Sequence, residues 1–211
     1  MELKQSTFVK HKLPCPKCGG SDPVSMNENG SAKCFSCGEF FTDYKNPDSV
    51  VPINKVNNTS YLNAYTGTYG SLTDRNISEA TAKKYGVRVV YNSDGSIAEH
   101  VYPYYNGNEI VAVKTRYVNN KSFRVSGSYE GTGLFGEQLY GKSKLPLTIT
   151  EGECDALAVV DLGIKSAVVS LKRGAAGAVR DVRDSIEFIE SFDKVVICFD
   201  NDKAGRKAAR D

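Results

Sequence analysis

The sequence lacks the features of membrane and secreted proteins. No run of eighteen apolar residues occurs along the 211 residues, and the N-terminal stretch MELKQSTFVKHKLP has no apolar segment of the kind that a signal peptide carries. We therefore expect a soluble intracellular protein that is not secreted and has no membrane partner. Apolar residues make up 40% of the chain, which is enough for one sizeable globular domain and a small one.

The chain also lacks a strong net charge, because its formal value is only +2, and this total does not by itself indicate a nucleic-acid partner. The distribution is more informative, since residues 110–146 contain six basic and two acidic residues, a local excess of +4. Alternating basic residues on a strand are often only a solvated face. Here four of them lie among the aromatic residues Tyr117 and Phe123, a mixture that suits phosphates and bases: Lys114, Arg116, Lys121 and Arg124.

Four of the six cysteines form two CxxC pairs, Cys15 with Cys18 and Cys34 with Cys37, with fifteen residues between the pairs. This spacing is typical of a tetrahedral zinc site with four cysteine ligands, and a reducing compartment disfavours the alternative of two disulfides. Between the pairs, Asn29-Gly30 predicts a hairpin turn. Residues 1–43 are therefore expected to form a small all-β zinc ribbon, which needs its metal to fold because roughly forty residues bury little surface.

The rest of the chain divides by its pattern into a linker and two modules. Residues 44–60 are rich in Asn, Pro and Ser without sustained periodicity, which is typical of a flexible linker. Residues 61–145 form a mixed, basic module, in which Ser78 is the expected N-cap of a helix that ends at Gly86. Strands follow this helix, and Asn106-Gly107 marks a hairpin between two of them.

From residue 146 onward strands alternate with helices, which predicts a parallel sheet of the α/β class. The strands are LTITE (147–151), SAVVSL (166–171) and KVVICF (194–199), and the helices between them are residues 154–163 and 179–192. The apolar run 195–199 is of the kind that lies in the middle of such a sheet. The expected fold class is therefore α+β and α/β, with a zinc ribbon attached to a basic module and a parallel α/β domain.

Acidic residues follow two of these strands. Glu151 ends the first strand, Gly152 permits a sharp turn, and Asp155 lies in the first turn of the next helix, while Asp200 and Asp202 follow the last strand. Functional residues of parallel sheets gather beyond the carboxyl ends of the strands, where the Lys172-Arg173 loop also falls. Carboxylates at this position suit Mg²⁺ or Mn²⁺. For Asp202, a simpler interpretation is the N-cap of a helix that begins near Lys203.

The pattern E-G-x-x-D at a strand end, followed by D-x-D-x-A-G, resembles the Toprim domain of DnaG-type primases, type IA and II topoisomerases, some small nucleases and RecR-type recombination mediators. Together with the four-cysteine ribbon, the basic module, LFGEQLY and VVSLKRGA, the order of parts resembles the primase half of the bifunctional primase-helicases of T-odd phages. The resemblance covers nearly the whole chain apart from the linker.

This resemblance implies a DNA primase, a nucleotidyltransferase that joins ribonucleoside triphosphates into short RNA primers on single-stranded DNA. It implies one structural Zn²⁺ in the ribbon, catalytic Mg²⁺ or Mn²⁺, a fused or partner helicase, a replicative DNA polymerase as partner, and action in the cytoplasm of a bacterial host. Glu151 is then a metal ligand or general base, Asp200 and Asp202 are metal ligands, and Asp155 supports them. The candidates for nucleotide phosphates and template are the basic residues Lys114, Arg116, Lys121, Arg124, Lys172 and Arg173.

The sequence departs from the family pattern at two points. Asn29 and Ser31 flank the hairpin glycine, where the family commonly has an acid and a histidine that help to read template bases. The chain also stops at Asp211, so we expect the Toprim domain, residues 146–211, to be truncated at its C-terminal end. Two other functions stay open, a non-catalytic module that recognises single-stranded DNA, as in recombination mediators, and a Toprim nuclease that uses the same metals to activate water.

Overall fold

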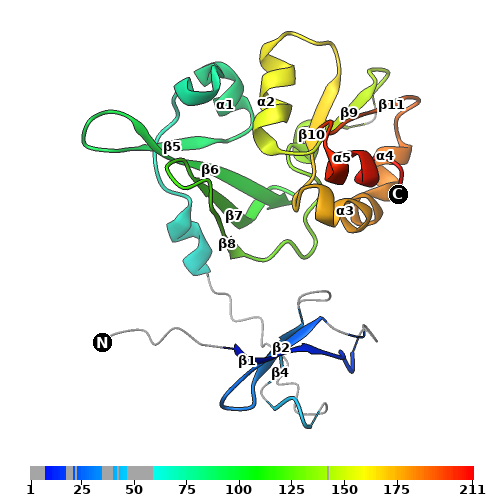
Figure 1. Ribbon diagram of the computed structural model, residues 1–211. Coiled ribbons are helices and arrows are strands. Elements are labelled where there is room, and N and C mark those ends of the chain that lie inside the picture. The colour runs from blue at the N-terminus through cyan, green and yellow to red at the C-terminus, as the bar shows by residue number, and fades with distance from the viewer. Residues whose placement is uncertain are drawn as a thin grey trace. The chain divides into compact units, whose positions relative to one another are not determined.

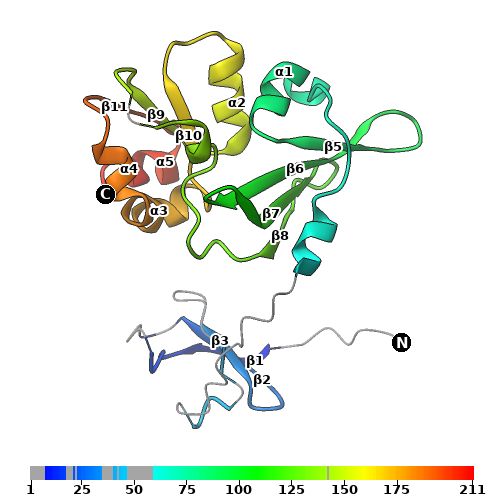
Figure 2. The ribbon, with the colours of Figure 1, turned by 180° about the vertical axis from the view of Figure 1, so that it is seen from behind.

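The computed structural model of the protein describes residues 8–17, 21, 23–34, 40, 41, 43–46, 59–141 and 143–211. The chain separates into two compact units, residues 1–58 and 59–211, which Figures 1 and 2 draw from opposite sides. Cys18, Cys37 and residues 47–58 of the expected linker lie outside the described residues.

The N-terminal unit contains an antiparallel sheet with the order β1-β2-β3-β4. Its strands are β1 (Phe8–Leu13), β2 (Val24–Asn27), β3 (Ala32–Cys34) and β4 (Phe40–Phe41). The hairpin predicted at Asn29-Gly30 is confirmed, because β2 pairs antiparallel with β3 and Gly30 has a φ of +84° in the turn. Cys15 and Cys34 are both buried and lie in one small apolar cluster with Val24, Ala32 and Phe41.

The second unit contains two sheets and five α-helices within its described residues (Figure 1). In chain order its elements are α1 (Glu79–Lys84), β5 (Arg88–Tyr91), β6 (Ile97–Asn106), β7 (Glu109–Tyr117), β8 (Phe123–Gly127), β9 (Leu147–Thr150), α2 (Glu153–Asp161), β10 (Ala167–Ser170), α3 (Ala178–Asp184), α4 (Ile186–Glu190), β11 (Val195–Cys198) and α5 (Lys203–Ala208). Short 3₁₀ helices lie at Thr59–Ala64, Thr73–Arg75, Glu137–Leu139 and Ala175–Gly177. None of the helices in the described ranges is long and apolar enough to cross a membrane.

The first sheet of this unit is antiparallel with the order β5-β6-β7-β8. Its local signals behave as the sequence predicts. Ser78 is the N-cap of α1 and its side chain accepts a hydrogen bond from the Thr81 amide, which satisfies one of the free N–H groups at the helix start. Asn106 ends β6 and Glu109 begins β7, so the hairpin predicted at Asn106-Gly107 is confirmed.

The second sheet confirms the predicted parallel α/β arrangement, because β9 pairs parallel with β10 on one side and with β11 on the other. In the part of the sheet that the structure describes, residues 195–199 do not lie in the middle as the sequence predicted. The sheet order is β10-β9-β11, so β9 has the central position and β11 forms an edge. Because only one side of β11 is paired and little packs on its faces, Val195 and Ile197 are 40% and 51% exposed.

The single helix expected at residues 179–192 is also corrected, because the structure has two helices, α3 and α4, that meet at Ser185. Ser185 adopts φ −118° and ψ 20°, outside the helical region. Serine competes with helix hydrogen bonding through its own side chain, which makes it a common point of interruption. The break allows Ile189 and Phe192 to join Ala178 in the core.

Two apolar clusters hold the second unit together. One joins α1, the antiparallel sheet, Phe135, Ala156 and Leu157 of α2, and Val168 of β10. The other joins inward side chains of β9 and β10, such as Ile149 and Val169, to α3 and α4. The first cluster contains residues from both sides of position 145, so the antiparallel and parallel sheets share a core.

Helices α1 and α2 lie side by side in both views and are joined by a polar clamp (Figures 1 and 2). Asp161, the last residue of α2, accepts hydrogen bonds from Ser78 Oγ at 2.5 Å, Thr81 Oγ1 at 2.6 Å and Ser78 N at 3.3 Å. The bonds from Ser78 and then Thr81 hold the pKa of Asp161 below its ordinary value. The clamp therefore ties the start of α1 to the end of α2.

Replacing Asp161 by alanine is expected to lower the free energy of unfolding by about 1 kcal/mol at neutral pH, because a charged acceptor is lost at an exposed site. A lowered pKa gives stability that is present above the unfolded value of about 3.9 and is lost as pH falls through the folded value. Urea unfolding at about pH 7 and about pH 3 should therefore show a larger difference at the higher pH. Asp193→Ala, in an exposed acid, is the control. A loss of equal size at both pH values would contradict this account.

Candidate active site

The carboxyl ends of the parallel strands face a cavity of about 640 Å³ that extends to β7 and β8. Its lining contains three of the four predicted catalytic acids, Glu151, Asp155 and Asp200. It also contains four of the six predicted basic residues, Lys114, Arg116, Lys172 and Arg173. The fold therefore brings together groups that are distant in sequence.

The turn between β9 and α2 places the first of these acids. Thr150 Oγ1 donates to the Gly152 carbonyl at 3.0 Å, and the Gly152 amide donates to Asp155 Oδ2 at 3.1 Å, so Asp155 caps its own helix. Gly152 itself has an ordinary φ of −125°. A Cβ atom at this position would lie 2.9 Å from Asp155 Oδ2, so a larger residue would require the Asp155 side chain to shift.

The Glu151 carboxylate lies between the loops that follow β10 and β11. Its two oxygens are 3.4 Å from the amides of Ala175 and Asp200, which are long, weak hydrogen bonds. Burial, followed by the nearby charge of Asp200, raises the pKa of Asp155. The acids therefore repel one another at neutral pH, and a positive ligand between them would relieve this repulsion.

Oxygen donors of this kind suit a hard divalent cation. Within the residues that the structure describes, however, no three His, Cys, Asp or Glu side chains converge closely enough to hold a metal ion. Magnesium commonly binds through one or two carboxylates and completes its coordination with water and substrate phosphates. The donor set fits such a site, and the phosphates of a ligand would supply the remaining oxygens.

Asp202 lies at the start of α5 and is absent from the cavity lining. Its Oδ1 accepts a hydrogen bond from the Gly205 amide at 2.8 Å, so it is the N-cap that the simpler sequence interpretation gives. Gly205 packs tightly against the same turn, because a Cβ atom there would lie 2.2 Å from the Asp200 carbonyl oxygen. The turn therefore holds Asp200 and Asp202 in fixed backbone positions.

The basic residues of the antiparallel sheet fall on two faces. In the β7–β8 register Arg116 lies opposite Phe123 and Lys114 opposite Val125, so these four side chains share the face that lines the cavity. Arg124 lies opposite Thr115 and therefore points to the other face. Lys121 is in the connecting turn with a φ of 56°. Lys121 and Arg124 are consequently not part of the cavity lining.

Lys114 is held by Glu153, a cavity residue that the sequence analysis did not select. The Lys114 ammonium is 2.7 Å from Glu153 Oε1 and 3.2 Å from the Lys172 carbonyl oxygen. Tyr104 also donates to Glu153 Oε1, and burial followed by the Glu153 charge raises the pKa of Tyr104 well above its usual value. In the sequence, Glu153 is marked only as an acid that opens a helix after E-G, because its partner Lys114 is 39 residues away.

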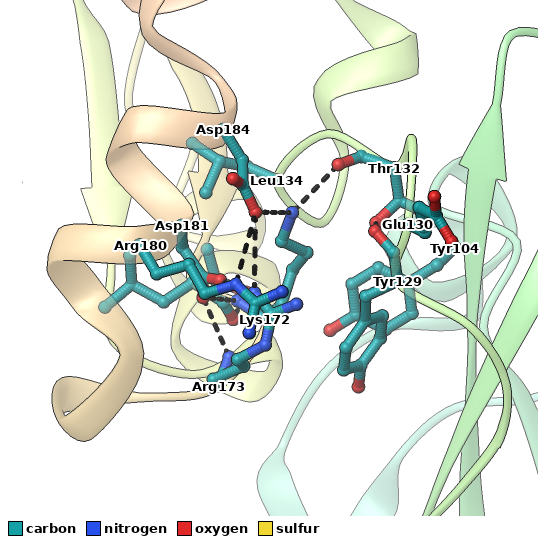
Figure 3. A network of polar contacts seen from close by, with 12 residues as sticks. Tyr104, Tyr129, Glu130, Thr132, Leu134, Lys172, Arg173, Arg180, Asp181 and Asp184 are labelled. Carbon is teal, nitrogen blue, oxygen red and sulfur yellow. Dashed lines mark hydrogen bonds and ion pairs between the residues drawn. The ribbon is translucent and has the colours of Figure 1, made fainter. Parts of the chain in front are cut away.

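The Lys172-Arg173 loop is fixed by two acids of α3 (Figure 3). Asp181 is fully buried and accepts hydrogen bonds from the amides of Lys172 and Arg173 at 2.7 and 2.9 Å, and it pairs with the Arg173 guanidinium. The Lys172 ammonium donates to the Thr132 carbonyl at 2.8 Å and lies 3.6 Å from Asp184. Burial lowers the pKa of Lys172. This placement favours a role of Lys172 in holding the loop, whereas Arg173 is partly exposed at the cavity.

A series of polar contacts from Asp74 reaches the cavity at Cys154. Asp74 Oδ1 is 2.9 Å from His100 Nε2, His100 Nδ1 is 3.1 Å from the Tyr102 hydroxyl, and that hydroxyl is 3.1 Å from Cys154 Sγ. Burial lowers the pKa of His100 even though Asp74 acts in the opposite direction. His100 is therefore a buried structural link, and this series of contacts fixes the first turn of α2 against β6.

Asn29 and Ser31 lie in the N-terminal unit and shape its hairpin. Asn29 Oδ1 accepts hydrogen bonds from Ser31 N at 3.1 Å and from Ser31 Oγ at 2.7 Å. Ser31 Oγ also accepts from Asn27 Nδ2 at 3.0 Å, and Ser31 is only 7% exposed. Both side chains are therefore engaged within the turn itself.

Comparison with known proteins is consistent with these features. Residues 148–211 match the Toprim-like family. The whole chain is 32% identical over 222 residues to the DNA helicase/primase of Enterobacteria phage T3, and it spans 38% of the length of that protein.

Two solved structures are similar to this chain. The crystal structure of the primase fragment of the bacteriophage T7 primase-helicase matches 97% of this chain and 84% of its own, with 33% identity and a TM-score of 0.62. The second is a structure of the bacteriophage T7 lagging-strand DNA polymerase interacting with primase domains of two gp4 subunits bound to an RNA/DNA hybrid and dTTP. It matches 68% of this chain and 72% of its own, with 35% identity and a TM-score of 0.60.

The Lys114–Glu153 pair provides a test of how the cavity is held. Glu153→Gln and Lys114→Met are each expected to lower the free energy of unfolding by about 3 kcal/mol, because each leaves the partner charge buried and uncompensated. The double variant should lose clearly less than the sum, since no unpaired charge remains. Urea unfolding followed by circular dichroism measures all three, with Glu187→Gln, at an exposed side chain of α4, as control. Losses that simply add would show that the two groups do not interact.

Proposed function

Because the chain belongs to the family of the primase part of phage primase-helicases, we propose that it is a DNA primase, which joins ribonucleotides into short RNA primers on a single-stranded DNA template. The observation that carries this proposal is the single cavity in which Glu151, Asp155 and Asp200 face Lys114, Arg116 and Arg173. Acids that suit divalent cations and bases that suit phosphates are the groups that nucleotidyl transfer requires.

In the proposed reaction, a 3′-hydroxyl attacks the α-phosphate of the incoming ribonucleoside triphosphate, a new phosphodiester bond forms, and pyrophosphate leaves. Glu151 accepts the hydroxyl proton or holds the cation beside it. Its weak contacts to the amides of Ala175 and Asp200 support this role, because they orient the carboxylate and leave it able to bind more strongly to a ligand.

Glu151, Asp200 and Asp202 are the proposed ligands for Mg²⁺ or Mn²⁺, with Asp155 as support. When bound, these cations supply charge neutralisation at the phosphates and activation of the attacking hydroxyl. Asp202 uses Oδ1 to cap α5, so its second oxygen is the proposed metal ligand. Asp155 contributes negative charge and keeps the turn at Gly152 closed.

The basic residues bind phosphates at different places in this proposal. Lys114, Arg116 and Arg173 line the cavity and bind the triphosphate, while Lys172 holds the loop that carries Arg173. Lys121 and Arg124 lie outside the cavity lining, where they contact the backbone of the template. Such contacts position nucleic acid without reading its sequence.

For the N-terminal unit we propose a zinc ribbon in which Cys15, Cys18, Cys34 and Cys37 hold one Zn²⁺. The burial of Cys15 and Cys34 in the same small cluster supports this ligand set, because each CxxC pair then sends one cysteine into the same core. The turn with Asn29 and Ser31 is the part of the ribbon proposed to contact template bases.

The proposed partners follow from the relatives. The phage T3 relative is a DNA helicase/primase, and the T7 structure contains a DNA polymerase with an RNA/DNA hybrid. We propose that this chain likewise acts with a fused or partner helicase and a replicative DNA polymerase, in the cytoplasm of a bacterial host. The chain spans less than half of the T3 protein, so the activity of the whole protein is part of the proposal.

The catalytic proposal predicts that Glu151→Gln abolishes primer synthesis while leaving the fold intact. Incorporation of labelled ribonucleotides on a pool of single-stranded templates with Mg²⁺ should fall by at least about 100-fold, because a neutral amide neither accepts the hydroxyl proton nor holds a divalent cation as a carboxylate does. Glu187→Gln makes the same chemical change at an exposed side chain of α4 and should retain full activity. If Glu151→Gln were as active as the control, the assignment of the site would be wrong. Cleavage of the templates in place of primer synthesis would favour the nuclease alternative.

The zinc proposal predicts one Zn²⁺ per chain, measured by atomic absorption after dialysis. Cys34→Ser should lower this content and destabilise the N-terminal unit, because the metal then has three ligands. Cys198→Ser, at an exposed cysteine of β11, is the matched control and should keep the zinc. An unchanged zinc content in Cys34→Ser would exclude the four-cysteine site.

A further inference from the structure

Phe123 is an apolar side chain in an otherwise charged site. It begins β8, lines the 640 Å³ cavity and is 51% exposed. Its neighbour on the same face of the strand, Val125, also lines the cavity and is 44% exposed. Exposing a large aromatic ring to water is unfavourable, so this wall would gain stability from a flat apolar partner.

Two cations lie over the Phe123 ring. Lys114 Nζ is 4.8 Å and Arg116 Cζ is 5.4 Å from the ring centroid, within the range of cation–π contacts. The strand register explains this arrangement, because Arg116 is the direct cross-strand partner of Phe123 and Lys114 is the diagonal one. Arg116 Nε is also buried without a hydrogen-bond partner among the described residues. The Phe123 ring therefore lies beside two cationic groups, one of which has hydrogen-bonding capacity that the described residues do not satisfy.

The cavity lining thus combines three kinds of group. Glu151 and Asp200 follow the parallel strands, while Lys114, Arg116 and Phe123 come from the shared face of β7 and β8. A nucleotide needs the same three kinds, because its phosphates bind cations and cationic side chains while its base presents an apolar face. A volume of about 640 Å³ is also in the range of sites for ligands of this size.

We propose that Phe123 stacks on a nucleobase in this cavity, while Lys114 and Arg116 bind the phosphates of the same nucleotide or the one next to it. This inference rests on the proposed function, because it takes the cavity to be the place where nucleotides react. The base belongs either to the incoming ribonucleotide or to the template, and both present the same π surface. Stacking on Phe123 positions this base without selecting its identity, because every base has a π face.

The sequence offers a direct probe, because it contains no tryptophan. In Phe123→Trp the new indole is the sole tryptophan, and stacking of a base on it quenches its fluorescence. Emission is expected to fall on addition of ribonucleoside triphosphates or of a single-stranded oligonucleotide, and whichever ligand quenches identifies the source of the base. Inorganic tripolyphosphate and an abasic oligonucleotide carry the same phosphates without bases and should leave the emission unchanged. Tyr91→Trp, exposed on β5 outside the cavity, is the matched control.

Affinity provides the second measurement. Removal of a stacked ring costs about 1–3 kcal/mol per base, so Phe123→Ala should weaken binding of the quenching ligand about 5- to 150-fold. Phe123→Tyr should restore binding, whereas Phe123→Leu, which keeps an apolar side chain but has no ring, should not. The unchanged protein and the Ala, Tyr and Leu variants should unfold at similar temperatures, since the Phe123 side chain is half exposed.

Three results would overturn the inference. They are emission of Phe123→Trp that no base-containing ligand quenches, equal quenching by the ligands without bases, and wild-type affinity in Phe123→Ala. None of these readouts requires turnover. Base-dependent quenching in a protein that makes no primers would support the stacking site and refute the catalytic proposal. Primer synthesis without quenching would support the catalytic proposal and refute the stacking site.

Discussion

The Lys114 ammonium connects the three parts of the molecule that enclose the cavity. It belongs to β7, pairs with Glu153 in the first turn of α2, and donates to the carbonyl of Lys172 after β10. The antiparallel sheet and the parallel sheet are thereby held together next to Glu151 and Asp155. Because both partners are largely buried, the pair sits in a medium of low polarity, where the loss of either charge is costly.

The same contact relates the resting structure to the proposed chemistry. A triphosphate that binds Lys114 must compete with Glu153 for the ammonium, and one that binds Arg173 must compete with Asp181 and Asp184. Lys114 and Arg173 are therefore already oriented by acids before a ligand arrives. Such preorganisation lowers the cost of ordering side chains during binding, and it makes the exchange of one negative partner for another nearly balanced.

Sequence alone predicted those features that depend on neighbouring residues in the chain. The Ser78 cap, the Asn29-Gly30 and Asn106-Gly107 turns, the alternation of strands and helices after residue 146, and the shared face of Lys114 and Arg116 all follow from local rules. The joint location of Glu151, Asp155 and Asp200 was also predictable, because the carboxyl ends of parallel strands meet at one edge of a sheet.

What sequence could not provide was the order of strands and the partners of charged groups. An apolar run such as Val195–Cys198 has the same pattern in the middle and at the edge of a sheet, and only the pairing with β9 decides. Lys172 looks like a surface cation until Thr132 and Asp184 are seen around it. Glu153 was passed over because its partner Lys114 is 39 residues away. These features are set by tertiary contacts between distant segments.

The edge position of β11 has a consequence for the behaviour of the protein in solution. Its outer side presents backbone donors and acceptors that pair with no other strand in the described part of the chain, together with the exposed apolar side chains of Val195, Val196 and Ile197. An open edge of this composition accepts a further strand, whether that strand belongs to the same polypeptide or to another. Pairing there would bury part of these apolar side chains and would respond little to salt, because the contact is apolar and hydrogen-bonded rather than ionic.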